Sequence, residues 1–219
     1  MKISIANKLK KQLHKDQGYL QDELMNILYD LFPDLILHGG TTIWRCFNGN
    51  RFSEDLNFYL SEETIVENKF KLALEKEGLT LVKYKTTDNV IFSKISDNKV
   101  EVRVEIRLLK KNDTIFAKKV IKEYEKIDGS TITINTLSAN DLLLEKANAF
   151  VNRKLVRDIY DVYFLSNFIE DSKEYDTKVI KLISQFQEPI DETTFKSIIL
   201  AGITPTVKQM KDAINKRFR

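Results

Sequence analysis

The sequence predicts an α+β fold in which a mixed region, about residues 1–136, is followed by an all-helical region, about residues 137–219. Two observations support this division. Several short runs before residue 137 alternate polar and apolar residues, which is typical of half-buried strands. From Ser138 onward the apolar residues recur at helical spacing instead. We therefore expect a sheet with accompanying helices first and a helical part after it.

The first elements follow from apolar spacing and from chain breakers. Residues 17–32 are predicted to form an amphipathic helix that ends at Pro33, because leucines and an isoleucine recur three or four positions apart. The next apolar run, residues 35–37, predicts a short strand that leads directly into Gly39-Gly40. A short helix over residues 41–47 is expected to follow.

Alternation predicts most of the sheet. A strand is expected over residues 55–60, and a helix that begins at Ser61-Glu62-Glu63 is expected to end before Gly78. Further strands are predicted over residues 79–85, 90–95, 100–109 and 131–136. In the helical region, Ser138 is the expected N-cap, with Asp141 in the first turn.

The composition limits the function classes. Hydrophobic residues make up 42% and charged residues 31%, which excludes a disordered or fibrous chain, and the net charge of +3 does not identify a nucleic-acid-binding protein. With one cysteine and two histidines, a divalent metal would have to sit on carboxylates, which favours Mg²⁺ or Mn²⁺. There is no apolar run of about 18 residues and no apolar leader segment at the N-terminus, so we expect a cytoplasmic protein without a membrane partner.

The segment around Gly39 and Asp55 carries the most functional information. Gly39 and Gly40 allow a phosphate to approach the backbone, and the following helix would offer it free N–H groups. Thr41 and Thr42 can add hydroxyl donors. Asp55 and position 57 share one strand face, where paired acids can hold Mg²⁺ against a triphosphate. Two glycines alone most often mark a turn, but strand, glycine pair, helix and acidic strand together are more specific.

These residues resemble a known family. Leu37-His38-Gly39-Gly40-Thr41-Thr42 together with Arg51-Phe52-Ser53-Glu54-Asp55-Leu56-Asn57-Phe58 is similar to the signature of AbiEii/AbiGii-type nucleotidyltransferases, in the polymerase-β-like superfamily. The resemblance implies a small mixed sheet flanked by helices, with a helical C-terminal region packed on it. It implies transfer of a nucleoside monophosphate from an NTP to an acceptor. Members are commonly toxins of toxin–antitoxin or phage-defence pairs, and some related toxins modify tRNA 3′ ends. An antitoxin and an RNA acceptor are thus the implied partners.

The resemblance also assigns roles to residues. Asp55, position 57 and a third acid would hold Mg²⁺ or Mn²⁺. Glu105 matches that third acid best, with Glu101 as the alternative; both could instead belong to a solvated strand face with ion pairs. The implied nucleotide-binding residues in the first region are Gly39, Gly40, Thr41, Thr42, Arg51 and Ser53.

A second motif is predicted to lie on one continuous helix. At about 100° per residue, Lys146, Arg153, Arg157 and Asp161 fall on one face, with Asp158 beside them. The family has similar residues in this order, so the resemblance implies that Lys146, Arg153 and Asp158 bind nucleotide and that Asp161 or Asp158 orients the acceptor. The alternative is a solvated helix face with spaced ion pairs.

Asn57 departs from the family, which has a second Asp there. An amide oxygen can bind a metal but brings no charge, so Asn57 should weaken metal binding. The residue is either natural or introduced to lower toxicity. Three functions remain open: an active nucleotidyltransferase toxin, a nucleotide- or partner-binding module without turnover, and a structural partner, which the intact Gly39-Gly40, Asp55 and Lys146 disfavour.

Overall fold

The computed structural model describes residues 5–62, 64, 67–169, 179 and 184–218. The chain divides into two compact units. The first contains residues 1–48 and 52–136, and the second contains residues 49–51 and 137–219. The chain therefore contributes residues 49–51 to the second unit before it returns to the first.

One mixed sheet organises the described part of the first unit. Its strands run in the order β3-β4-β5-β2-β1-β7-β6. The pairs β1–β2, β3–β4 and β4–β5 are antiparallel, whereas β1–β7 and β2–β5 are parallel. The strand bounds are β1 Ile36–His38, β2 Leu56–Ser61, β3 Thr80–Thr86, β4 Val90–Ser96, β5 Glu101–Leu109, β6 Lys119–Glu125 and β7 Thr131–Leu137.

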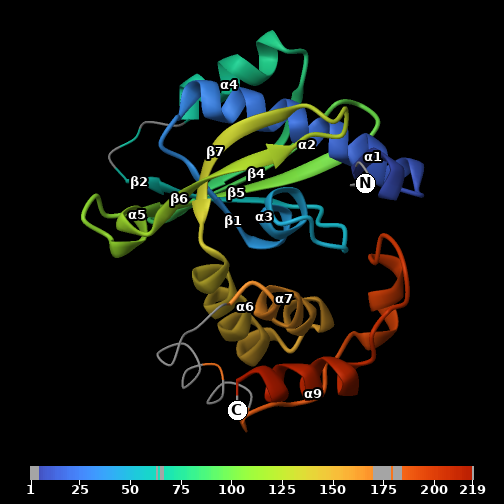
Figure 1. Cartoon of the computed structure of the whole chain (residues 1–219). Helices are drawn as coiled ribbons and strands as arrows, with labels where there is room; N and C mark the ends of the chain where they lie inside the picture. Colours follow the sequence, from blue (N-terminus) through green and yellow to red (C-terminus); the bar gives the residue numbers. More distant parts are fainter. Residues whose placement is uncertain (1–4, 63, 65–66, 170–178, 180–183, 219) are drawn as a thin grey trace. The chain divides into compact units, whose positions relative to one another are not determined.

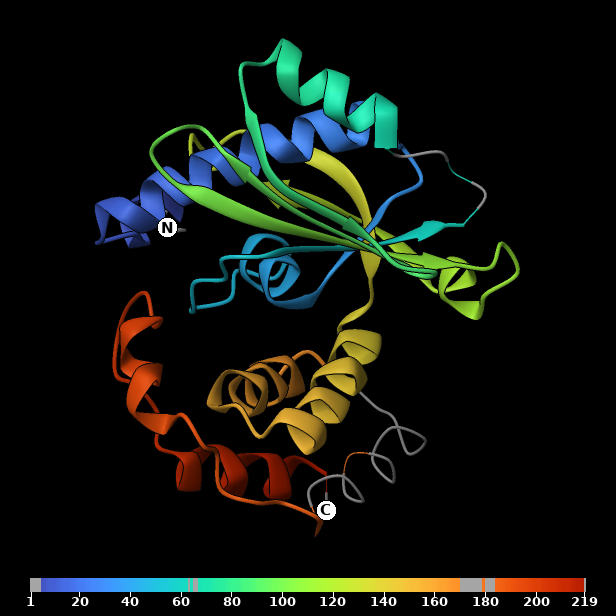
Figure 2. The same cartoon turned by 180° about the vertical axis from the view of Figure 1, so that it is seen from behind.

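Helices cover both faces of this sheet. In Figures 1 and 2, α2 and α4 lie over one face, and α3 lies on the opposite side. The helices of the unit are α1 Ile5–Lys8, α2 Gln12–Leu31, α3 Gly39–Cys46, α4 Glu67–Lys76 and α5 Thr114–Ala117. The main core forms between the sheet and α2 with α4, where the alternation of β5 buries Val102, Val104 and Ile106. The intervening polar residues of β5 therefore lie on the other face.

The second unit is helical over its described residues. Its elements are α6 Ala139–Arg153, α7 Val156–Ser166, a 3₁₀ helix η1 at Glu192–Ser197, and α9 Val207–Arg217. The Ser138 hydroxyl accepts a hydrogen bond from the Asp141 N–H and so caps α6, as the sequence predicts. Helix α6 ends at Arg153, and the next residue, Lys154, caps it with a left-handed φ of 55°. A new helix then starts at Val156.

Most predicted elements are confirmed, and the differences have local causes. The continuous helix predicted for the second motif is wrong, because Lys154 breaks it. A helix start at Ser61 is also wrong, since β2 continues to Ser61 and α4 starts at Glu67; Glu63 lies outside the described residues. Helix α3 begins at Gly39 rather than at Thr41, so the glycine pair forms its first two residues.

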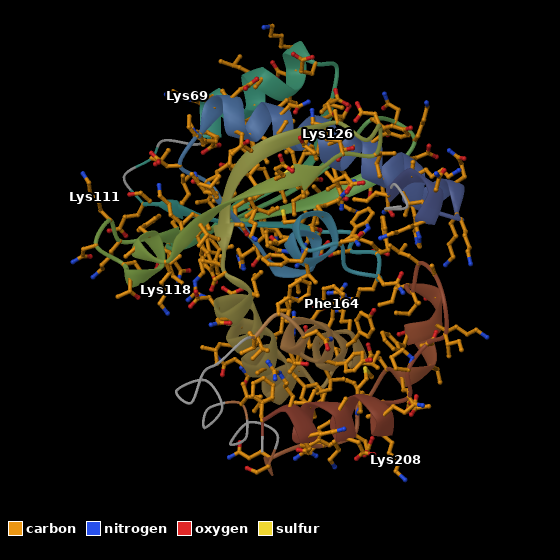
Figure 3. All side chains as sticks on the ribbon, in the orientation of Figure 1. Lys69, Lys111, Lys118, Lys126, Phe164 and Lys208 are labelled. Atoms are coloured by element: carbon orange, nitrogen blue, oxygen red, sulfur yellow. The ribbon has the colours of Figure 1, made fainter. Side chains whose placement is uncertain are left out.

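The outer surfaces carry charged side chains. Lys69 on α4, Lys111 after β5 and Lys208 on α9 are exposed and point away from their elements (Figure 3). No helix in the described part of the chain is both long and apolar enough to cross a membrane.

Candidate nucleotidyltransferase site

The start of α3 has the geometry that a phosphate site needs. Gly39 has φ +83°, which residues with a Cβ rarely adopt. A Cβ at this position would also lie 3.2 Å from Asn57 Nδ2, so Gly39 lets β1 pass close to Asn57 on β2. The first N–H groups of α3 have no acceptor within the helix and carry its partial positive charge. This end of α3 can therefore bind an anion.

Asp55 and Glu105 converge next to that helix start. Asp55 directly precedes β2, and Asn57 is aligned with Glu105 in the parallel β2–β5 register. Nη2 of Arg103 lies 3.6 Å from Asp55 Oδ2 and 3.4 Å from Glu105 Oε2. One cationic nitrogen thus contacts both carboxylates. The alternative third acid, Glu101, is paired with Lys94 instead.

These residues fit a hard divalent cation. Two carboxylates that already share a guanidinium nitrogen can share a metal ion, and Asn57 can supply an amide oxygen. Oxygen donors of this kind suit Mg²⁺ or Mn²⁺. Within the described ranges, no group of three or more His, Cys, Asp or Glu side chains is placed to hold a metal. Asn57, whose backbone is aligned with Glu105, stays the predicted third donor, and it is neutral.

The hydroxyl residues of the motif are placed differently from the expectation. Thr41 and Thr42 are fully buried. The Thr41 hydroxyl donates to the Asp55 carbonyl oxygen at 2.6 Å, and Thr42 Oγ1 has no hydrogen-bond partner among the described residues. Gly40 is buried as well, and Ser53 is half-buried. Phosphate binding by these four residues stays a prediction.

A second cluster lies in the helical unit. Arg51 is buried and holds Asp161 through two hydrogen bonds, Nε to Oδ1 at 2.6 Å and Nη2 to Oδ2 at 2.5 Å. Lys146 Nζ lies 3.0 Å from the same Asp161 carboxylate. Burial alone would raise the pKa of Asp161, but the charges of Arg51 and Lys146 outweigh it and lower that pKa.

Asp158 extends this cluster. Arg153 Nη2 donates to Asp158 Oδ1 at 2.7 Å, and Lys146 lies 3.8 Å from the same oxygen. Lys146, Asp158 and Asp161 are buried, while Arg153 is 48% exposed. The alternative of a solvated helix face is therefore wrong for the first three. The structure brings Lys146, Arg153, Asp158 and Asp161 together with Arg51. Their contacts with nucleotide or acceptor stay predictions.

The sequence motifs did not predict two residues that lie near the loop before Asp55. Gln21 on α2 donates to the carbonyl oxygens of Ser53 and Glu54, just before Asp55. Arg45 on α3 contacts Asp22 on α2 at 3.1 Å. These contacts join segments that are distant in the sequence. Neither Gln21 nor Arg45 belongs to a motif or a periodic pattern that would predict such a contact.

Comparisons with known proteins identify the family of the chain. The model of the family described as "Nucleotidyl transferase AbiEii toxin, Type IV TA system" matches residues 24–216. No protein of curated function matches the sequence significantly.

Solved structures share the fold at low sequence identity. JHP933 from Helicobacter pylori is 19% identical with a TM-score of 0.65, and the match covers 95% of this chain and 91% of that one. A second H. pylori structure is 20% identical with a TM-score of 0.66, over 96% and 94% of the two chains. MenT4, a nucleotidyltransferase toxin from Mycobacterium tuberculosis, is 16% identical with a TM-score of 0.51, over 96% and 85%.

The family match spans most of the chain and includes both clusters described above. The mixed sheet with its helices is consistent with a polymerase-β-like nucleotidyltransferase core. The chain belongs to the AbiEii family of nucleotidyl transferase toxins.

Proposed function

We propose that this protein transfers a nucleoside monophosphate from an NTP to an RNA acceptor, with release of pyrophosphate. Residues 1–136 would form the catalytic core. The observation that carries the proposal is the convergence of Asp55 and Glu105 on one cationic nitrogen, beside the N-terminus of α3. An anion site and a cation site that adjoin each other suit a metal-bound triphosphate.

Each of these residues has a chemical task in the proposal. Asp55 and Glu105, with the Asn57 amide oxygen, would hold Mg²⁺ or Mn²⁺. Such an ion neutralises triphosphate charge and stabilises the attacking and leaving oxygens. The left-handed turn at Gly39 leaves the backbone open to the phosphates, and the N–H groups that begin α3 would bind them.

A weakened enzyme that acts as a nucleotide- or partner-binding module is the second candidate. Asn57 favours it, because the site then carries two negative charges rather than three. Fewer charges bind divalent ions less strongly and stabilise the transition state less. The site would still be able to bind a nucleotide.

The family assignment also bears on partners. Its description includes a type IV toxin–antitoxin system. We propose that a cognate antitoxin limits the activity of this chain, that the acceptor is tRNA or another cellular RNA, and that the protein acts in the cytoplasm. A small antitoxin gene beside this one would support the first of these points.

Labelled NTP tests the proposal directly. Each of the four NTPs is incubated with total cellular RNA, Mg²⁺ and the full chain, and transfer is read as label in RNA. The Asp55→Asn variant is the control, because it removes a metal-holding charge with little change in shape. Transfer that disappears in Asp55→Asn supports the enzyme. NTP binding by calorimetry without transfer supports the binding module, and no binding of any NTP contradicts both.

A further inference from the structure

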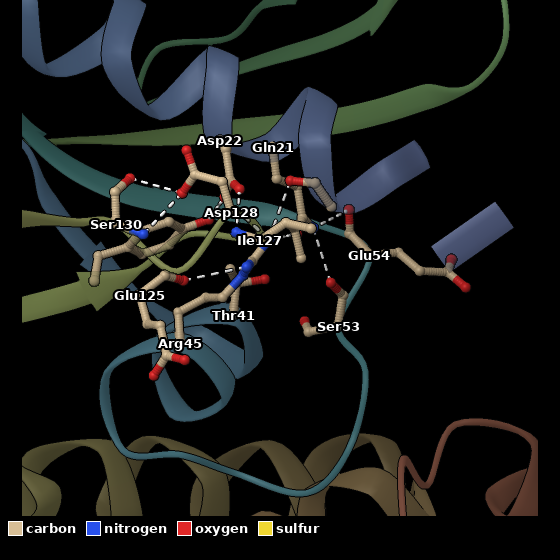
Figure 4. Close-up of polar contacts among 12 residues, drawn as sticks. Gln21, Asp22, Thr41, Arg45, Ser53, Glu54, Glu125, Ile127, Asp128 and Ser130 are labelled. Atoms are coloured by element: carbon tan, nitrogen blue, oxygen red, sulfur yellow. Dashed lines mark hydrogen bonds and ion pairs between the residues drawn. The ribbon is translucent and has the colours of Figure 1, made fainter. Parts of the chain in front are cut away.

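Side chains hold three successive carbonyl groups just before β2. Gln21 Nε2 donates to the Ser53 oxygen at 2.8 Å and to the Glu54 oxygen at 3.0 Å, and the Thr41 hydroxyl donates to the Asp55 oxygen at 2.6 Å. Figure 4 shows Gln21 pointing from α2 toward this loop. The register of β2 with β5 begins at Leu56, so these three carbonyls belong to the loop that leads into the strand.

The orientation of Gln21 is itself fixed. The side chain is completely buried. Its Oε1 faces Arg45 Nη2 at 3.5 Å, and a guanidinium can only donate, so the amide oxygen must lie on this side. The Nε2 group, which can only donate, then faces the two carbonyls. No flipped orientation satisfies both sets of partners.

Arg45 is anchored in turn by groups from two other segments. Its Nη2 contacts Asp22 Oδ1 at 3.1 Å and the Gly18 carbonyl at 3.1 Å, and its Nη1 donates to the Glu125 carbonyl at 3.2 Å. Asp22 also accepts from the Ile127 N–H at 2.7 Å. Gln21 is thus attached to a rigid, buried network on one side and to the loop on the other (Figure 4).

We propose that Gln21 is a positioning residue that fixes the Ser53–Asp55 backbone and so directs the Asp55 carboxylate toward Glu105. This inference rests on the proposed function, because it assumes that the two carboxylates hold a metal. A carboxylate at the end of a loop must be held by its backbone if it is to share one ion with a strand residue. The family model matches from residue 24 onward, so Gln21 lies outside it.

Manganese binding to the full chain tests the inference without any need for activity. The variant Gln21→Met keeps the length of the side chain and removes both donors. Gln21→Glu keeps an acceptor for Arg45 and turns the donor into a second acceptor that repels the carbonyls. Gln17→Met is the matched control, because Gln17 lies one turn earlier on α2 and bonds the Glu101 carbonyl, at 3.4 Å. Asp55→Asn removes the carboxylate itself.

The expected result is a loss of Mn²⁺ affinity of about tenfold in both Gln21 variants, from two lost hydrogen bonds of ordinary strength. Gln17→Met should bind as the wild type does. Circular dichroism at the temperature of the titration shows that each variant is folded. A merely structural role would lower stability and leave the affinity of the folded protein unchanged.

The outcomes separate the inference from the proposed function. Wild-type affinity in either folded Gln21 variant, with loss of binding in Asp55→Asn, overturns the positioning role and leaves the metal site standing. A wild type that binds no Mn²⁺, or that binds it as Asp55→Asn does, overturns the metal site and the inference with it. If neither Gln21 variant folds, Gln21 is a folding residue and the positioning role is rejected.

Discussion

Arg51 and Asp161 form a buried, two-pronged ion pair although 110 positions separate them in the sequence. The pair lies wholly in the helical unit, because residues 49–51 belong to it. Two residues after Arg51 the chain reaches Ser53, and Asp55 follows. The loop that leads to Asp55 therefore starts at a buried ion pair.

Removing Arg51 should strongly destabilise the helical unit. Arg51→Ala leaves the Asp161 carboxylate buried with Lys146 as its remaining cation. Breaking a buried pair by removing one partner costs about 3 to 5 kcal/mol. Urea unfolding followed by circular dichroism measures the loss. Arg153→Ala is the comparison, because Arg153 is 48% exposed and Lys146 stays beside the buried Asp158, so its loss should be smaller; equal losses in the two variants would contradict the assignment.

The Asp161 carboxyl should make stability fall in acid. Its pKa is lowered on folding, so the unfolded chain takes up the proton first as the pH drops. The contribution is fully present above the ordinary value of 3.8 and is lost as the pH falls through the lower folded pKa. Unfolding free energies of wild type and Asp161→Asn, measured from about pH 5 to about pH 2, should converge toward the acid end. A constant difference would mean that Asp161 keeps its ordinary pKa.

Asp22 should behave in the opposite way. Burial raises its pKa, and Arg45, the Ile127 N–H and Tyr124 offset this only in part. The folded state then binds the proton more tightly, so the Asp22 contribution declines as the pH rises from 3.8 through the higher folded pKa. Comparison with Asp22→Asn over this range isolates the effect. A contribution that grows with pH would show that Arg45 outweighs the burial of Asp22.

The contrast between these two acids shows what the sequence could predict. Local patterns predicted the alternation of β5, the Ser138 cap and the strand that leads into Gly39, because each depends on neighbours in the chain. The partners of Asp22 and Asp161 come from segments up to 110 positions away, and no spacing rule records them. The sequence therefore predicted Asp161 as a site residue but neither its burial nor its pairing with Arg51.

Two further misses have local physical reasons. Lys154 adopts a left-handed conformation that glycine or asparagine normally signals, so the break between α6 and α7 left no mark in the sequence. Strand β6, Lys119–Glu125, is at the edge of the sheet and is mostly exposed at its start. An exposed edge strand does not need to alternate polar and apolar residues. The alternation that predicts a strand was therefore absent at its start.

Restoring a carboxylate at position 57 should strengthen the dependence on metal. In Asn57→Asp the new charge lies beside Asp55 and Glu105, so the metal-free site is destabilised by repulsion. Mg²⁺ then binds more tightly and stabilises the fold by about 2.7 kcal/mol at 100 times its Kd. Thermal unfolding with and without Mg²⁺ measures this, and nucleotide transfer to RNA should rise in parallel. Asn112→Asp, on an exposed turn, controls for the added charge; an equal Mg²⁺ response in the two variants would exclude position 57 from the site.

Arg103 should compete with the metal for the two carboxylates. Its Nη2 contacts both Asp55 and Glu105, so a metal ion that binds them must displace it. The contacts are half exposed, and such pairs are worth about 0.2 to 1 kcal/mol, which corresponds to a gain in Mg²⁺ affinity of up to about fivefold in Arg103→Met. Arg107→Met, on the same strand face, removes a similar charge without that contact and should leave the affinity nearly unchanged. Calorimetric titration of both variants with Mg²⁺ tests this competition. Weaker Mg²⁺ binding in Arg103→Met would mean that Arg103 holds the two carboxylates in place for the ion rather than competing with it.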